Sequence, residues 1–177
     1  MLYSVSPQYT RELPVLEEID ISGVTKDNPY AQEIKIWKTY ATYLYQFLSS
    51  MGMMLQILDK TVKDPETNAE IKKALHAMFV AVTNVYDAFR SGIADMQAGK
   101  KPEYHFDPVP PPPWPDPDHP QSFFQSIWNF FRPILEQVIG KLNAGSPFAT
   151  AVAALINSGD EIVKILDGVA LPATMSD

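Results

Sequence analysis

Apolar side chains recur along residues 30–62 at steps that alternate between four and three residues without a slip. This row comprises Tyr30, Ile34, Trp37, Ala41, Leu44, Leu48, Met51, Leu55, Leu58 and Val62. Such a 3.5-residue repeat is typical of a helix packed along its whole length on a partner helix. A second row beside it comprises Ile36, Tyr40, Tyr43, Phe47, Met54 and Ile57. The combined apolar face is too wide for one partner, so we expect this helix to contact at least two others.

A second stretch with the same repeat follows after a short break. The sequence Asp64-Pro65-Glu66 interrupts the pattern, and Thr67 with Glu70 predicts a capping box at the start of the next helix. The apolar row of this helix comprises Ile71, Leu75, Met78, Val82, Val85, Phe89, a glycine slot at Gly92, and Met96. Two helices of about 34 and 32 residues joined by so short a connection must run antiparallel. Residues 28–99 are therefore predicted to form a long helical hairpin.

The outer ends of this hairpin carry their own signals. Asn28-Pro29 predicts the start of the first helix, because asparagine caps helices and proline suits the first helical position. Gly99 predicts the end of the second. Residues 1–27 are acidic and contain two prolines, so we expect an extended arm docked on the helices. The apolar residues expected to dock it are Leu13, Val15, Leu16, Ile19 and Ile21.

Residues 100–120 form a proline-rich linker whose densest part reads DPVPPPPWPDPDHP, from Asp107 to Pro120. Successive prolines fix φ and favour a polyproline II rod, here about 43 Å long. Such a rod could carry the chain back along the hairpin and set the third helix parallel to the second. It could equally hold two separate hairpins apart, and the sequence does not decide between these arrangements.

A second, shorter hairpin is predicted over residues 121–172, followed by a frayed tail at 173–177. The main apolar row of its first helix comprises Phe124, Trp128, Phe131, Leu135, Val138 and Leu142. We expect a kink at Pro133, a start of the fourth helix at Ser146-Pro147, and a bend near Ser158-Gly159-Asp160. The predicted fold is all-α: an elongated bundle of two antiparallel helical hairpins, about four helices, joined by a proline-rich rod.

Composition and motifs argue against several functions. The net charge of −7 disfavours a nucleic-acid binder, and the absence of cysteine excludes thiol catalysis and thiolate metal sites. The sequence has no phosphate-binding loop, nucleophile elbow or metal-binding helix motif. His76 is expected at the surface. His105 and His119 could share a cation across the rod, but we favour turn and capping roles for them. No cofactor, metal or catalytic residue is therefore predicted.

The wide apolar faces predict a non-enzymatic protein–protein interaction or assembly module that presents apolar helical surface to a protein partner or to itself. The residues expected to make this contact are Tyr40, Tyr43, Phe47, Met54, Phe123, Ile127, Phe130 and, in the proline tract, Trp114. The two hairpins could instead cover each other's apolar stripes and give a closed monomer.

An alternative function belongs to a different class. The aromatic third helix could lie on or insert into a membrane, as in leaderless secreted proteins of the toxin or translocator type. No conventional signal peptide is apparent at the start of the sequence. The expected location is therefore the cytoplasm, or outside the cell by a route that needs no such signal.

Overall fold

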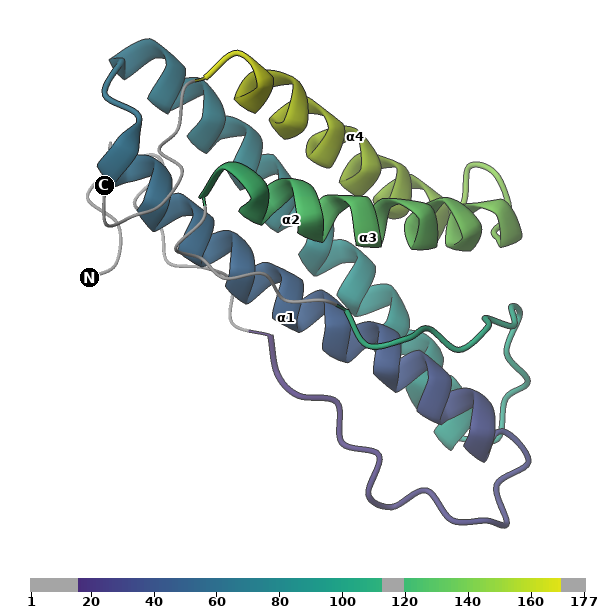
Figure 1. Ribbon diagram of the computed structural model, residues 1–177. Helices are drawn as coiled ribbons and strands as arrows, with labels where there is room; N and C mark the ends of the chain where they lie inside the picture. Colours follow the sequence, from purple (N-terminus) through teal and green to yellow (C-terminus); the bar gives the residue numbers. More distant parts are fainter. Residues whose placement is uncertain (1–15, 113–119, 170–177) are drawn as a thin grey trace.

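The computed structural model describes residues 16–112 and 120–169, with side chains from Phe123 onward in the second range. Within these ranges the chain forms four helices and no strand: α1 (Ala31–Thr61), α2 (Pro65–Gln97), α3 (Pro120–Lys141) and α4 (Pro147–Asp167). Contacts of α1 with α2, α2 with α4, and α3 with α4 join them into one bundle (Figure 1). The predicted all-α class is confirmed.

The first two helices are antiparallel neighbours. Lys72 Nζ donates to Asp59 Oδ1 at 2.7 Å near one end of the pair, and Asn28 Nδ2 donates to the Met96 carbonyl at 3.1 Å near the other. The described part of the linker then runs back along α1, so that α3 follows the same general direction as α2 (Figure 1). Of the two routes that the sequence left open, the chain takes the one that returns along the first pair of helices.

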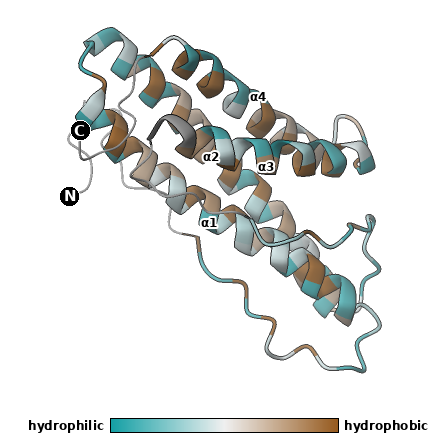
Figure 2. Ribbon diagram, viewed as in Figure 1, coloured by the Kyte–Doolittle hydropathy of each residue, from teal (hydrophilic) through white to brown (hydrophobic). Residues whose placement is uncertain are grey.

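The described part of the linker is packed on the bundle and does not stand apart from it. Phe106 is only 1% exposed, and its ring centroid lies 5.0 Å from that of Trp37 in α1 and 5.6 Å from that of Phe89 in α2. Phe148 of α4 joins the same aromatic cluster, 5.2 Å from Phe89. Hydrophobic residues recur along all four helices, with hydrophilic residues between them (Figure 2). A single core therefore extends through all four helices and the described part of the linker.

Two predicted helix starts are wrong in detail. The first helix begins at Ala31, because Asn28 accepts a bond from the Tyr30 amide (2.8 Å) and so forms a turn before the helix. The second begins at Pro65, where we expected a break. Asp64 and not Thr67 provides the cap: its carboxylate accepts from the Thr67 amide at 3.0 Å and from the Thr67 hydroxyl at 2.6 Å.

The other predicted ends agree with the structure. Ser146 caps α4 by accepting a bond from the Ala149 amide at 3.1 Å, with Pro147 at the first helical position. Gly99 follows α2 with a φ of 89°, a conformation that glycine adopts without steric cost. The third helix continues through Pro133 as a single element.

The helix α4 runs without interruption through Ser158–Asp160, where a bend was predicted. Gly159 serves a different purpose: a β-carbon there would overlap the six-membered ring of Trp128 on α3. Gly92 on α2 has the same relation to Trp37 on α1. Each glycine therefore lets a tryptophan ring pack directly against a helix backbone.

The N-terminal arm is docked on the bundle from the point where its description begins. Leu16 and Ile19 are each 7% exposed, and Ile21 is partly buried against the core. These three residues agree with the predicted docking. Leu13, Val15 and the predicted tail at 173–177 lie outside the described residues.

Candidate functional site: an apolar pocket between α1 and α3

The structure separates the predicted contact residues into two groups. Phe47, Met54, Phe123 and Ile127 are each at most 2% exposed. In this structure the four side chains are covered within the chain and are not at its surface. Phe47, for example, packs against Phe131 and Trp128 of α3, with ring centroids 5.0 and 6.1 Å away. For these four residues, the structure corresponds to the alternative in which apolar faces are buried within the chain.

The other predicted residues lie closer to the surface. Tyr43 and Phe130 are partly exposed, while Tyr40 is 9% exposed and reaches the edge of a pocket. Trp114 lies outside the described residues. Tyr40, Tyr43 and Phe130 come from α1 and α3, so these two helices carry the part of the predicted surface that is accessible.

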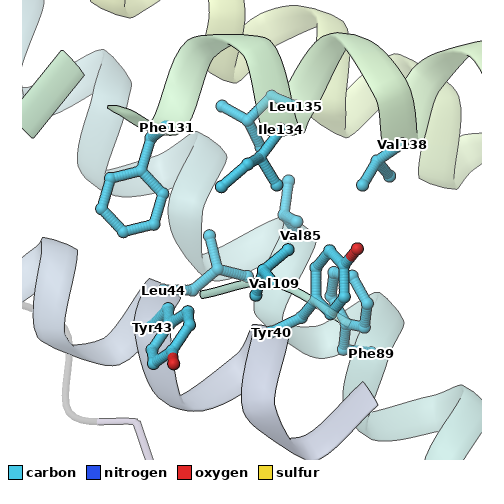
Figure 3. Close-up of a pocket in the computed structure, with 10 residues that line it drawn as sticks. All are labelled: Tyr40, Tyr43, Leu44, Val85, Phe89, Val109, Phe131, Ile134, Leu135 and Val138. Atoms are coloured by element: carbon cyan, nitrogen blue, oxygen red, sulfur yellow. The ribbon is translucent and has the colours of Figure 1, made fainter. Parts of the chain in front are cut away.

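A small pocket of about 20 Å³ lies between these helices, enough for one water-sized group (Figure 3). All ten residues that line it are apolar or aromatic: Tyr40, Tyr43, Leu44, Val85, Phe89, Val109, Phe131, Ile134, Leu135 and Val138. Tyr43, Val109 and Ile134 are partly exposed, so they form its mouth. Figure 3 shows α1 and α3 side chains facing each other across it.

Tyr40 and the linker build one wall of the pocket. The Tyr40 hydroxyl donates to the Asp107 carbonyl at 2.6 Å, and its ring stacks on Phe89 with centroids 5.4 Å apart. Burial, aided by the negative charges of Asp107 and Glu33, raises the pKa of Tyr40 to about 12. The hydroxyl therefore stays neutral near pH 7 and donates its hydrogen to the Asp107 carbonyl.

The linker is held in place beside this wall by Glu33 near the start of α1. The Glu33 carboxylate accepts bonds from Trp37 Nε1 (3.0 Å) and the Phe106 amide (3.3 Å), and it pairs with His105 Nδ1. At the far end of α3, Lys141 Nζ donates to the His105 carbonyl at 3.1 Å. His105 thus fixes the linker to α1 and α3. His119, for which we favoured a capping role over a cation shared with His105, lies outside the described residues.

The described residues hold no group of three or more histidine, aspartate or glutamate side chains that could bind a metal ion. His76 is exposed on α2, as predicted. The lining of the pocket offers no carboxylate, imidazole or amine, so its chemistry is that of a binding site for an apolar group.

Comparison with protein families, characterised proteins and solved structures finds no match to this chain.

No helix in the described part of the chain combines the length and the hydropathy that crossing a lipid bilayer requires.

Sequence reasoning missed the part that the linker plays in this site. Val109 stands among prolines, and Phe106 precedes them, outside any helical repeat. Two apolar residues at a spacing of three in a polar, proline-rich stretch were the available signal. Their burial could not be predicted from periodicity, because the linker has none.

Replacing Tyr40 with phenylalanine is expected to lower the free energy of unfolding by about 1 kcal/mol at pH 8, because the bond to the Asp107 carbonyl is lost. At high pH the phenylalanine variant should become the more stable of the two proteins. The pKa of Tyr40 is higher in the folded state than in the unfolded chain, so wild type loses stability as pH rises from 10 to about 12. That loss is on the order of 2 kcal/mol, and the phenylalanine variant escapes it.

Urea unfolding of both proteins at pH 8 and pH 11.5 checks this result. Tyr45→Phe is the matched control, because Tyr45 is 47% exposed on the same helix. This substitution should leave the free energy of unfolding unchanged at both pH values. A constant stability difference between wild type and Tyr40→Phe across this pH range would contradict the prediction.

Proposed function

We propose that the protein is a non-enzymatic helical interaction module that binds a protein partner at the apolar pocket between α1 and α3. The observation that carries the proposal is the uniformly apolar lining of this pocket, with Tyr43, Val109 and Ile134 partly exposed at its mouth. A partner would place an apolar side chain over the mouth and cover these residues. Burial of apolar area, about 25 cal/mol per Å², would stabilise the complex.

The surface beside the pocket supports the same interpretation. Phe130 is partly exposed on α3, and its ring lies 5.2 Å from that of Phe131, which lines the pocket. Aromatic side chains are enriched at protein interfaces because they bring large apolar area at low entropic cost. The partner is either another protein with an apolar helix or a second copy of this chain.

The membrane-active alternative depended on aromatic side chains of the third helix being at the surface. Phe123, Phe124 and Trp128 are each 2% exposed and belong to the core. Protein interaction is therefore the function that we propose.

Ile134→Asp places a charge at the mouth of the pocket and tests the proposal. Val80→Asp is the matched control, because Val80 is 48% exposed on α2 and does not line the pocket. Sedimentation velocity over a wide concentration range measures self-association, and affinity capture with the three immobilised proteins measures partner binding. Circular dichroism verifies that all three are folded.

We expect wild type and Val80→Asp to associate with equal affinity. Ile134→Asp should associate at least tenfold more weakly, a difference of about 1.4 kcal/mol. An association that all three proteins share equally would place the interface elsewhere. A monomer that retains no partner in any form would contradict the proposed function.

A further inference from the structure

The arm segment, residues 16–20, is bound to α1 and α2 through its backbone. The Glu17 carbonyl accepts bonds from the Tyr86 hydroxyl at 2.6 Å and from Arg90 Nη2 at 3.0 Å. Lys38 Nζ donates to the Ile19 carbonyl at 2.6 Å, and Gln97 Nε2 donates to the Asp20 carbonyl at 3.1 Å. Four side-chain donors on two helices thus bind three carbonyl oxygens of one extended segment.

The side chains of the arm segment add two further kinds of contact. Leu16 and Ile19, three positions apart, are buried, whereas Glu17 and Glu18 between them are exposed. The two glutamates lie near cations: Glu18 is 3.5 Å from Lys38 Nζ, and Glu17 is 4.0 Å from Arg90 Nη1. Exposed pairs of this kind contribute little energy but favour an acidic ligand over a basic one.

We call the surface that holds the segment the arm groove and define it by Lys38, Thr42, Tyr45, Tyr86, Arg90 and Gln97. Its donors are partly ordered by contacts on the helices themselves, since the Arg90 guanidinium lies 5.2 Å from the centroid of the Tyr86 ring. The groove also has unfilled space. A hollow of about 350 Å³ beside Leu16 is lined by Glu18, Lys38, Thr42, Tyr45 and Tyr86.

We propose that the arm groove is a binding site for an extended segment of a partner protein, and that the chain's own arm occupies it until a partner displaces it. The partner segment has apolar residues at its first and fourth positions and acidic residues between them, like Leu16 to Ile19. Carbonyl oxygens are common to all peptides, so the same four donors suit the backbone of a partner segment as well as that of the arm. This proposal does not rest on the pocket between α1 and α3, because the groove is formed by α1 and α2.

Competition by the tethered arm provides the test. The probe is a fluorescent synthetic peptide with the sequence of residues 14–24, and the variant is the full chain with Ile19→Asp, which places a charge in a buried site of the arm. The peptide should bind Ile19→Asp at least tenfold more tightly than wild type, because the variant no longer fills its own groove. Ser22→Asp, at an exposed position of the arm, is the matched control and should behave as wild type.

Groove variants and a scrambled peptide test whether the peptide binds in the arm groove and whether its sequence matters. Adding Lys38→Met and Arg90→Met to Ile19→Asp should weaken peptide binding at least tenfold, and a scrambled peptide should not bind. Equal binding of the peptide to folded Ile19→Asp and wild type, or equal binding of the scrambled peptide, would overturn the proposal. A wild-type dimer that Ile19→Asp abolishes would support it and would identify a second copy as the source of the segment.

A second measurement uses the wild-type arm and decides the outcome if Ile19→Asp does not fold. The chain has no cysteine, so Ser22→Cys carries a single dye on the arm. Excess unlabelled arm peptide should lower the anisotropy of this dye in a saturable manner as the arm leaves the groove. No change, or the same change with scrambled peptide, would overturn the proposal.

Discussion

Replacing Trp128 with alanine is expected to lower the free energy of unfolding by about 3 to 5 kcal/mol, the usual cost of removing a large buried aromatic side chain. Trp128 is 2% exposed and stacks on Phe124, with ring centroids 6.1 Å apart. Its indole nitrogen donates to Asp160 Oδ1 at 3.0 Å, a carboxylate that Arg132 also binds. Alanine would remove these contacts and leave a void in front of Gly159. Urea unfolding followed by circular dichroism measures the loss.

The role of Gly159 gives this prediction a sharper form. Alanine is favoured over glycine inside a helix by about 1 kcal/mol, but here its methyl group would overlap the Trp128 ring. We expect Gly159→Ala to destabilise the wild type by about 1 to 2 kcal/mol net, because overpacking exceeds the helix preference. In the Trp128→Ala background the same change should stabilise, because the methyl group then enters the void.

Gly140→Ala is the matched control for this reversal. Gly140 lies in α3, and a β-carbon there would meet nothing within 4 Å. The substitution should stabilise both backgrounds by up to about 1 kcal/mol. If Gly159→Ala stabilised wild type in the same way, the close packing of Trp128 on the α4 backbone would be refuted.

Periodicity predicted the helices because burial imposes it. The row from Ile34 to Leu58 is buried throughout, as a helix with neighbours on two sides requires. The same argument could not say where those neighbours come from. Phe47 and Ile127 belong to wide apolar faces, and such faces are covered equally well by another helix of the chain or by another molecule. Only the three-dimensional arrangement shows that both residues are buried within the chain, with Phe47 packed against α3.

Local errors arose where one residue type fits two structures. Proline after Asp64 suits a helix break and also the first turn of a helix, and the structure has the second arrangement, with Asp64 as the cap. Gly159 fits a bend and also a close approach of a ring. At Gly159 the deciding contact comes from Trp128, which is distant in sequence. At Pro65 the geometry of the Asp64 cap decides.

The arm groove was beyond sequence reasoning for a different reason. It binds the carbonyl oxygens of Glu17, Ile19 and Asp20. Every residue has a carbonyl oxygen, so the sequence does not indicate which ones are bound. Its donors have nothing in the sequence that marks them as a group: Tyr86 is a buried residue of α2, and Lys38 is a partly exposed residue of α1. The apolar residues of the arm could be predicted to dock, but not the surface that receives them.

Lys72 is the one charged side chain that is buried among the described residues, at 5% exposure. It lies on α2 and donates to Asp59 Oδ1 of α1 at 2.7 Å, near the turn that joins the two helices. Asp59→Ala would leave the ammonium group buried without this carboxylate. We expect a loss of about 3 kcal/mol in the free energy of unfolding, the lower end for broken buried pairs, because Asp59 itself is 23% exposed.

Removing the other partner of the ion pair should lower the free energy of unfolding much less. Lys72→Met keeps the apolar volume and leaves a carboxylate that water can reach, so we expect a change within about 1 kcal/mol. The double variant should also lie within about 1 kcal/mol of wild type, because neither charge remains. Urea unfolding of the four proteins measures the coupling between the two residues. A loss below about 1 kcal/mol for Asp59→Ala would mean that the ammonium group reaches water when its partner is removed, and that the ion pair does not hold the ends of α1 and α2 together.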